Sequence, residues 1–340
     1  MRSANYKSEY TDKDGTKPVP GDDIVTTYKG KLIGQSGSIV RMSIDGLRTE
    51  GFISTQDRQD YFIEPAANYS SSARSNEVVI FQAKDKVNNS VINLGSDALV
   101  AQLKNSVDNQ AKAQFLKAGF SPFSGIAQTA MKSIQVDTDV DTGFILNNNG
   151  GSITRTRSRV SYALNVTDGI YERDLNLSVT EGYFHYWKCC DPYGSLTGLA
   201  LVQAFRSYWN ANFPQYSYPR NVAHLFSDNY TATEAGGYGF IGPICKTPSS
   251  AYSATYIQNS TDGYAAVVAH EIGHNLGATH TSDSSTGCQE PGCEGTLMQE
   301  QIQLDFNTFC PYSINQITNY FRPLYDPNRA DGLLCDPTLQ

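Results

Sequence analysis

The feature that most constrains this chain is the clustering of its histidines. Three of the five lie within one short stretch, as His270, His274 and His280. An apolar run over residues 264–269 precedes them and predicts a helix over 263–276. Because side chains four residues apart leave the same face of a helix, His270 and His274 can bind one metal ion.

Glu271 and Gly277 complete the predicted site. Glu271 is placed to accept a proton from a water molecule on the metal. Gly277 ends the helix, because a residue free to adopt positive φ lets the chain turn and bring back His280 as a third ligand. Three neutral imidazoles and one open position are the pattern of a catalytic zinc site. The alternatives are a chance His-Glu-x-x-His pattern on a core helix and a structural metal site, in which an open position beside a glutamate has no purpose.

The bulk composition excludes several classes of protein. The 340 residues are 39% hydrophobic, enough to fill a core, and carry a net charge of −8 with a pI of about 5.1. Such a chain offers no basic face to nucleic acid or to an anionic membrane. No apolar run reaches the ~18 residues that span a bilayer. The first residues are too polar for a signal peptide, so we expect any export signal to precede this numbering.

The seven cysteines all lie in the second half of the chain. None has the Cys-x-x-Cys spacing of metal or redox sites, so we expect disulfides formed in an oxidising compartment, with at least one thiol unpaired. Six Asn-x-Ser/Thr sequons also agree with a secreted protein. The cysteines are Cys189, Cys190, Cys245, Cys288, Cys293, Cys310 and Cys335, and the sequons begin at Asn68, Asn88, Asn165, Asn176, Asn229 and Asn259.

The chain divides into four predicted segments. Residues 1–20 are polar and predict a flexible lead-in. Residues 21–120 predict a small β-rich domain, in which an antiparallel sheet is followed by a helix over 96–117. Residues 121–131 predict a linker, because small residues break the helical pattern there, and residues 132–340 form the last domain. The strands expected in the β-rich domain are 24–28, 38–43, 51–54, 61–63 and 78–81.

The last domain is predicted to have an α+β fold with a mixed twisted sheet. A strand over 132–136 leads into an acidic stretch over 137–141. Helices over 153–175, capped by Ser152, and over 195–210 alternate with strands before the helix that carries the histidines. The remaining strands are expected over 175–186, 221–226, 237–241 and 252–257.

The pattern His270-Glu271-x-x-His274-x-x-Gly277-x-x-His280 followed by Met298 resembles the extended motif of the metzincin clan of zinc endopeptidases. Within the clan, the chain most resembles the reprolysin or adamalysin family, including its microbial members. The resemblance covers about residues 130–335 and implies a zinc-dependent endopeptidase that cleaves proteins or peptides. The β-rich region resembles the propeptide of such enzymes. The branch is indicated by Gly273-His274-Asn275-Leu276-Gly277, by the segment from Ala223-His224-Leu225-Phe226 to Cys245, and by the later cysteines.

The resemblance also implies roles for residues outside the motif. Met298 would form a turn beneath the zinc and give the ligand rings an apolar floor; the alternative is an ordinary core methionine. A free edge strand would bind an extended peptide by backbone hydrogen bonds, against the alternative of a glycine-rich turn. Its residues are Gly237, Tyr238, Gly239, Phe240 and Ile241. Cys245 would pair with Cys335, whereas Cys288, Cys293 and Cys310 would staple the segment around Met298 in an order that stays open.

Several departures from the reprolysin pattern bear on the branch and on latency. Thr281 stands where reprolysins usually have Asp, and Met298 lacks their preceding Cys and following Pro. These differences indicate a divergent member or a neighbouring branch such as the pappalysins. The N-terminal region has no Cys, so a thiolate from it cannot block the zinc. Asp22 or Asp23 is a candidate carboxylate for that role, with a solvated acidic turn as the alternative. No Tyr closely follows Met298, so the transition-state tyrosine of astacins and serralysins is not expected.

The remaining candidate residues have simpler expected roles. His185 and His224 are predicted to be a strand-surface and a sheet histidine rather than metal ligands. Adjacent Cys189 and Cys190 are not expected to pair with each other, so one should pair at a distance. A structural calcium ion, as in family members, is a second candidate cofactor, against solvated acidic loops. Its candidate ligands are Asp137, Asp139 and Asp336.

The sequence therefore predicts a secreted zinc metalloendopeptidase, with His270, His274 and His280 as zinc ligands and Glu271 as general base and acid. The N-terminal region is a candidate intramolecular inhibitor, which would make the chain a zymogen. The alternative from another class is a binding or adhesion protein that keeps the metalloprotease fold as a scaffold. Loss of a ligand or of the glutamate would indicate that alternative, and neither is lost here.

Overall fold

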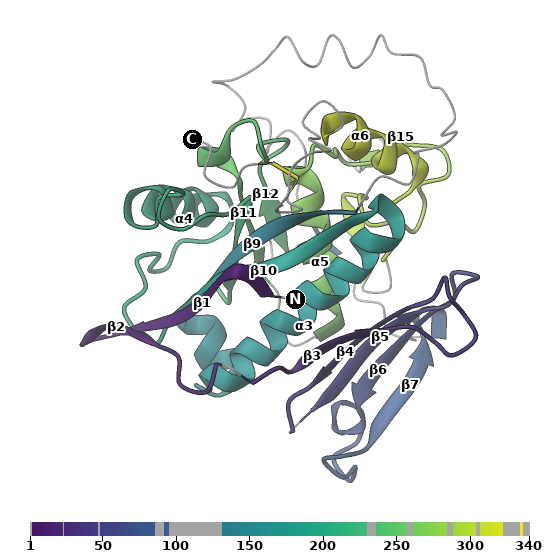
Figure 1. Cartoon of the computed structure of the whole chain (residues 1–340), viewed down its shortest axis with the longest axis horizontal. Coiled ribbons are helices and arrows are strands. Elements are labelled where there is room, and N and C mark those ends of the chain that lie inside the picture. The colour runs from purple at the N-terminus through teal and green to yellow at the C-terminus, as the bar shows by residue number, and fades with distance from the viewer. Residues whose placement is uncertain are drawn as a thin grey trace.

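A seven-stranded and a five-stranded sheet both pack against one long helix, α3 (Ile153–Leu175), as Figure 1 shows. This arrangement confirms the α+β fold and the β-rich N-terminal region. The computed structural model describes residues 2–22, 24–46, 48–85, 92–94, 131–229, 236–256, 261–283, 288–303, 307–321 and 334–335.

The large sheet has the strand order β12-β13-β11-β9-β10-β1-β2. Its five inner strands run parallel to one another, whereas the strands at both edges, β12 and β2, are antiparallel to their neighbours. The sheet is therefore mixed, as predicted. The strand bounds are β1 (Arg2–Asp12), β2 (Gly15–Pro18), β9 (Lys132–Val140), β10 (Leu177–Trp187), β11 (Val222–Ser227), β12 (Gly237–Gly239) and β13 (Tyr252–Tyr256).

Different helices cover the two faces of the large sheet. On one face, α3 and α5 (Thr261–Asn275) share a core with Val222 and Phe226 of β11. On the other face, α4 (Gly198–Asn212) packs with Ala223 and Leu225 of the same strand. The division follows the two-residue period of a strand. Helix α6 (Pro311–Phe321) adds Ile317 to the first core.

The helix α3 has the predicted bounds and the predicted cap. The Ser152 side chain accepts a hydrogen bond from the backbone N–H of Arg155 at 3.2 Å, and Asn176 ends the helix in the left-handed conformation at φ 51°. The helix is buried along most of its length although many of its buried residues are polar. Buried polar groups need partners, and the N-terminal sheet supplies several of them.

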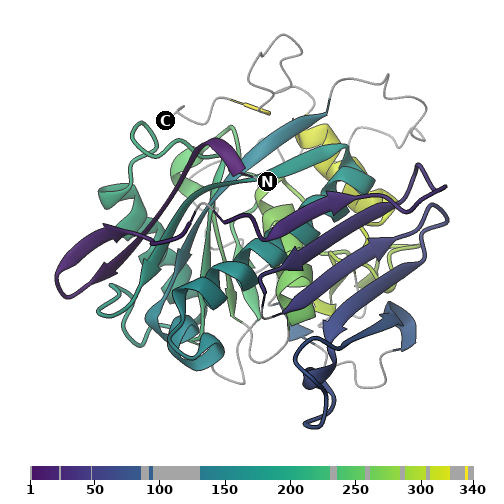
Figure 2. The ribbon, with the colours of Figure 1, turned by 60° about the horizontal axis from the view of Figure 1, so that its bottom comes forward.

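The five-stranded antiparallel sheet lies against α3, as Figure 2 shows. Charged and polar contacts join the two. Arg41 of this sheet lies 3.0 Å from the Asp168 carboxylate and 2.6 Å from that of Glu172, both on α3. Asn165 of α3 donates to two backbone carbonyls of the sheet and is buried, so its sequon is not exposed in the folded chain. The strands are β3 (Thr27–Gly30), β4 (Ile39–Ile44), β5 (Thr49–Ser54), β6 (Asp60–Pro65) and β7 (Val78–Gln82).

The first twenty residues do not form the predicted flexible lead-in. They form β1, which pairs in parallel with β10, and β2, which pairs with β1. The Tyr6 ring lies 5.9 Å from that of Phe184, and Val19 is buried. The polar composition suggested a lead-in, but backbone pairing with an open strand edge does not require apolar side chains. The partner strand lies far along the chain, so no local sequence pattern predicts the pairing.

The acidic stretch over 137–141 is mostly strand rather than loop. β9 extends to Val140, and Asp137 and Asp139 are fully buried. The Asp139 carboxylate lies 2.9 Å from Nδ1 of His185 and accepts hydrogen bonds from the indole N–H groups of Trp187 and Trp209 at 3.1 and 2.9 Å. These bonds account for the buried aspartate without a calcium ion. His185 is likewise buried and not at the strand surface.

Several predictions fall on residues outside the described ranges: the helix over 96–117, the linker up to residue 130, Asp23 and Asp336. Before the longest of these gaps, β8 (Ile92–Asn93) pairs with β16 (Gln301–Ile302), and the Leu94 N–H donates to the Glu300 carbonyl at 2.8 Å. The last small sheet pairs β14 (Ser282–Asp283) with β15 (Cys288–Gln289). Of the helices described, none is both long and apolar enough to span a membrane.

Candidate metal centre

The helix α5 carries His270 and His274 one turn apart. Their Nε2 atoms lie 2.9 Å from each other, and Nε2 of His280 lies 3.1 Å from that of His270 and 3.2 Å from that of His274. Two nitrogens that each lie ~2.0–2.1 Å from one tetrahedral zinc ion would be about 3.3 Å apart, which is close to these separations. In the described part of the chain, these three histidines are the group that could hold a metal.

Backbone carbonyls determine which nitrogen of each ring faces the others. Nδ1 of His270 contacts the Leu297 carbonyl, and Nδ1 of His274 lies 2.8 Å from the Ala278 carbonyl. A carbonyl can only accept, so each Nδ1 carries the proton and each Nε2 presents a lone pair. Burial lowers the pKa of His270, and the neighbouring histidines lower it further. Converging lone pairs on neutral rings repel one another unless a cation lies between them, so the donor set fits a metal ion.

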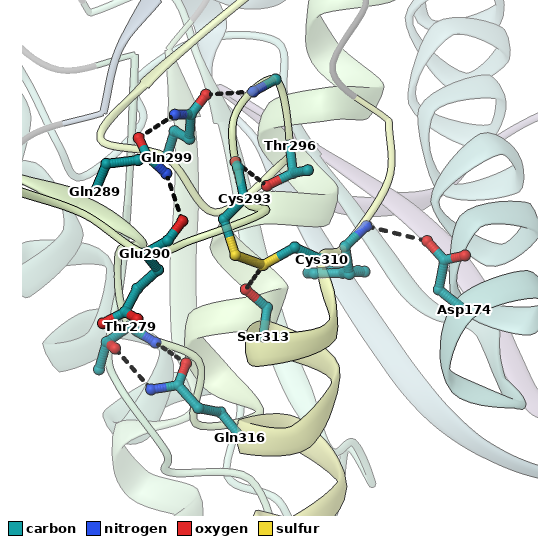
Figure 3. Close-up of a disulfide and its surroundings, with 12 residues drawn as sticks. Asp174, Thr279, Gln289, Glu290, Cys293, Thr296, Gln299, Cys310, Ser313 and Gln316 are labelled. Carbon is teal, nitrogen blue, oxygen red and sulfur yellow. Dashed lines mark hydrogen bonds between the residues drawn. A yellow bond between two sulfur atoms is a disulfide. The ribbon is translucent and has the colours of Figure 1, made fainter. Parts of the chain in front are cut away.

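His280 reaches the other rings because the chain turns sharply after α5. Gly277 has φ +94°, and a Cβ atom there would lie 2.8 Å from the Tyr320 ring. Both the conformation and the space therefore require glycine at this position. The residue before His280 is held by α6: the Gln316 amide accepts from the Thr279 N–H at 3.1 Å and donates to the Thr279 hydroxyl at 2.8 Å, as Figure 3 shows.

Met298 lies against the helix between the two histidine turns. It is fully buried, and a Cβ atom on Gly273 would come within 2.9 Å of its sulfur. Its carbonyl accepts from the Thr281 N–H at 2.8 Å, so the segment carrying Met298 is tied to the residue that follows His280. Thr281 is itself buried, and its hydroxyl has no hydrogen-bond partner in the described structure.

Glu271 lies between α5 and the edge strand β12. A Cβ atom on Gly237 would lie 2.5 Å from its Oε1, and one on Gly239 would lie 3.0 Å from its Oε2. The glutamate is buried, burial raises the pKa of its carboxyl, and Oε1 lacks a hydrogen-bond partner among the described residues. Of the edge residues predicted over 237–241, β12 itself contains the first three, and Phe240 and Ile241 follow it.

Two further side chains, Asn275 of α5 and Tyr320 of α6, bond to backbone carbonyls of β13 and of the segment that follows β12, and sequence reasoning missed both. The Asn275 amide donates to the carbonyls of Phe240 and Tyr252 at 2.7 and 3.0 Å. The Tyr320 hydroxyl donates to the Gly242 and Ile244 carbonyls. Asn275 lies inside the histidine motif, which is the one signal that could have drawn attention to it. Every residue has a backbone carbonyl, so no sequence pattern could have predicted the roles of the Leu297 and Ala278 carbonyls.

The described residues include two disulfides. Cys245 is bonded to Cys335, and Cys293 is bonded to Cys310 at the base of α6 (Figure 3). The second bond encloses the segment with Met298 and resolves part of the order that the sequence leaves open. Cys189 and Cys190 are both free of disulfides, so neither pairs at a distance, and their sulfurs lie 2.7 Å apart.

Other candidate residues do not join the centre. The Asp22 carboxylate accepts from Arg157 at 2.6 Å and from the Tyr6 hydroxyl at 2.7 Å, so it is engaged elsewhere. His224 lies 2.8 Å from the hydroxyls of both Ser253 and Thr255, and burial lowers its pKa to about 3. It is a sheet histidine, as predicted.

A reprolysin-type model of metallo-peptidase family M12 matches residues 131–321. A zinc metalloproteinase-disintegrin-like protein from Cerberus rynchops is 28% identical over 170 residues, which cover 48% of this chain and 26% of the relative. The chain thus spans about a quarter of that relative's length. A solved structure described as a chaperone-substrate complex matches with a TM-score of 0.40 and 15% identity over 60% of this chain and 31% of the other.

The family match covers more than half of the chain and spans all residues of the histidine motif as well as Met298. The members of this family are metallopeptidases, and the converging imidazoles provide a donor set that suits zinc. The chain belongs to metallo-peptidase family M12.

Proposed function

We propose that this chain is a secreted zinc-dependent endopeptidase, with His270, His274 and His280 as the zinc ligands and Glu271 as general base and acid. The observation that carries the proposal is the convergence of three imidazole lone pairs close to Glu271, a buried glutamate of α5 whose Oε1 has no partner among the described residues. A scaffold that had lost its activity would have no reason to keep this unsatisfied carboxylate, because an unpaired buried polar group is costly.

The residues divide the chemistry between them. A zinc ion held by the three histidines would supply Lewis-acid chemistry, lowering the pKa of water and polarising the scissile carbonyl. Glu271 removes a proton from the attacking water and delivers it to the leaving amine. Burial raises the pKa of Glu271, and the charge of a bound cation opposes this, which suits a group that both takes and returns a proton. Met298 gives the ligand rings an apolar floor.

We propose β12 as the strand that aligns the substrate. The Phe240 N–H donates to Tyr252 of β13, and the Tyr256 N–H donates to Gly236. Because the backbone groups of alternate residues point to opposite sides of a strand, those of Gly237 and Gly239 face the outer edge. No described strand pairs with that edge. An extended peptide placed there would form a backbone ladder directly beside Glu271.

The N-terminal region is proposed to restrain the enzyme through the segment behind Met298. The pairing of β8 with β16 and the buried Leu94 support this, since β16 begins three residues after Met298. Asp22 is not the inhibitory group in this proposal, because Arg157 and Tyr6 engage it. Phe52 and Phe62 belong to the same core as α3, which supports a region that stays docked.

The extracellular setting is supported by the two disulfides, because such bonds persist in oxidising compartments. The sequons at Asn68 and Asn176 lie on exposed residues and could accept glycans.

The test is hydrolysis of an unfolded protein by the purified chain, before and after proteolysis within residues 95–130. We expect cleavage that a chelator stops and added zinc restores, with a higher rate after proteolysis if the N-terminal region inhibits. A zinc-loaded protein that stays inert in both forms, yet binds the substrate, would instead support the adhesion alternative.

A further inference from the structure

Adjacent Cys189 and Cys190 follow β10, and their side chains face each other. Successive side chains normally point to opposite sides of an extended strand. Here the two Sγ atoms lie 2.7 Å apart. A disulfide bond is about 2.05 Å long, so the two sulfurs are already close to bonding distance.

A backbone turn brings the two sulfurs together. Cys190 has φ 61°, one of four positive φ values among the described residues other than glycine. This conformation is unfavourable for a residue with a Cβ atom and persists only where the surroundings hold it. The Lys188 N–H donates to the Thr11 carbonyl at 2.9 Å before the pair. After the pair, the Asp191 carboxylate accepts from the N–H groups of Thr142 and Tyr193 at 3.3 and 3.2 Å.

The pair is accessible to small oxidants. Cys190 is exposed and Cys189 is half-buried. The two described disulfides, in contrast, join cysteines that are not adjacent in the sequence. A protein that forms those bonds folds where disulfide oxidants are present. In such a compartment, two thiols that already lie side by side can form a disulfide with each other with little rearrangement.

We propose that Cys189 and Cys190 form a vicinal disulfide. In the reaction, both thiols lose their protons and together give two electrons to an oxidant of the disulfide class, such as oxidised glutathione. The S–S bond of the oxidant breaks to yield two thiols, and one S–S bond forms between Cys189 and Cys190. The pair is thus a modification site separate from the metal centre.

The bond would fix the turn against which the N-terminal hairpin of β1 and β2 is seated. The Lys188 ammonium lies 4.0 Å from the centre of the Tyr10 ring on β1, and its backbone N–H bonds to Thr11 of the same strand. Lys188 immediately precedes the pair, so closing the ring restricts the backbone next to both contacts. The redox state of the pair is therefore linked to the docking of β1.

Peptide mapping tests the bond. The full chain is incubated with oxidised glutathione, alkylated with iodoacetamide and digested without reduction. We expect the peptide containing Cys189 and Cys190 to be unlabelled and lighter than the dithiol form by two hydrogen atoms, and to gain two labels only after reduction. The disulfide between Cys293 and Cys310 serves as an internal control for oxidation. Two alkylated or glutathionylated cysteines, or a bond from either one to another cysteine, would overturn the proposal.

Variants test separately whether the disulfide forms and whether it affects the docking of β1. In Cys189→Ser and in Cys190→Ser, the remaining thiol should take up one glutathione, which the wild type should not retain. Amide hydrogen exchange at Lys188 should be faster in the double variant Cys189→Ser/Cys190→Ser than in the oxidised wild type. Equal exchange rates would contradict the link to β1 docking, whatever the mapping shows.

Discussion

Gly237 of β12 and Glu271 of α5 are in direct contact. A Cβ atom on Gly237 would lie 2.5 Å from Oε1 of Glu271 and 2.8 Å from Cγ1 of Val267. The strand proposed to align the substrate and the proposed general base therefore share one surface. Glycine at this position allows the carboxylate to reach the edge where a scissile bond would lie.

Gly237→Ala should impair turnover. The added methyl group meets the carboxyl end of Glu271 and Cγ1 of the buried Val267, so the carboxylate has to move and the contact between β12 and α5 has to adjust. A displacement of about 1 Å in a reacting group costs roughly 10²-fold in rate. We expect kcat to fall by roughly 10- to 100-fold with zinc content unchanged, measured by peptide hydrolysis and metal analysis. Gly30→Ala is the matched control, because its Cβ atom would meet only Val40 at an ordinary 3.8 Å.

Arg41→Met should weaken the docking of the N-terminal sheet on α3. The substitution leaves Asp168, which is 1% exposed, without its guanidinium partner. Breaking a buried pair typically costs about 3–5 kcal/mol. We expect the lower end, a loss of ~3 kcal/mol in the free energy of unfolding, because Lys29 also lies 2.6 Å from Asp168. Urea denaturation measures the loss.

An exposed pair provides the control for this prediction. Arg74 and Glu77 lie 2.7 Å apart, but their side chains are 79% and 41% exposed. Arg74→Met should therefore change the free energy of unfolding by less than about 1 kcal/mol. Equal losses in the Arg41 and Arg74 variants would contradict the claim that the sheet is held on α3 by buried charges.

Asp137→Asn should remove a pH dependence of stability. Burial raises the pKa of the Asp137 carboxyl to about 7, against the opposing effects of Arg220 and of hydrogen bonds from Tyr183 and Gln135. The folded state therefore binds this proton more tightly than the unfolded state. The contribution to stability is complete below about pH 4 and is lost as the pH rises towards 7.

The measurement for Asp137 compares the variant with the wild type at two pH values. Relative to the wild type, Asp137→Asn should gain stability between pH 5 and pH 8, by on the order of a few kcal/mol. Urea denaturation of both proteins at both pH values gives the difference. A difference between the two proteins that is independent of pH would show that the raised pKa does not affect folding.

Zinc should stabilise the folded chain, and chelation should lower Tm. A ligand that binds the native state alone adds about 2.7 kcal/mol at a free concentration 100 times its Kd. His280→Ala removes one imidazole and should abolish most of the shift in Tm that zinc produces. Magnesium serves as the control cation, since it prefers oxygen ligands. A zinc-dependent shift of wild-type size in the variant would exclude His280 as a ligand.

The sequence predicts the parts of this structure that depend on local patterns. The helix α3 has the predicted bounds, because its cap at Ser152 and its apolar spacing lie within the segment itself. The convergence of the three histidines follows the predicted pattern, because helical periodicity brings His270 and His274 together and one glycine turn brings the chain back to His280. Both cases need information from fewer than about thirty neighbouring residues, a span that sequence periodicity covers.

The features that the sequence misses depend on contacts between distant segments. β1 is a strand because β10 offers it an open edge, and its own polar residues do not indicate this. Asp139 can be buried because His185 and three aromatic side chains from separate parts of the chain bond to it. Gln316 positions the residue before His280 from another helix. The approach of Cys189 to Cys190 depends on a positive φ that no sequence rule assigns to cysteine.

The most direct test of the central claim is the hydrolysis of an unfolded protein by Glu271→Gln and by the wild type at equal zinc content. The substitution keeps the size of the side chain and removes its ability to take up a proton. If Glu271 is the general base and acid, the variant should retain one zinc ion per chain and lose roughly 10²- to 10⁴-fold in rate. A variant that binds zinc and cleaves at the wild-type rate would contradict the mechanism.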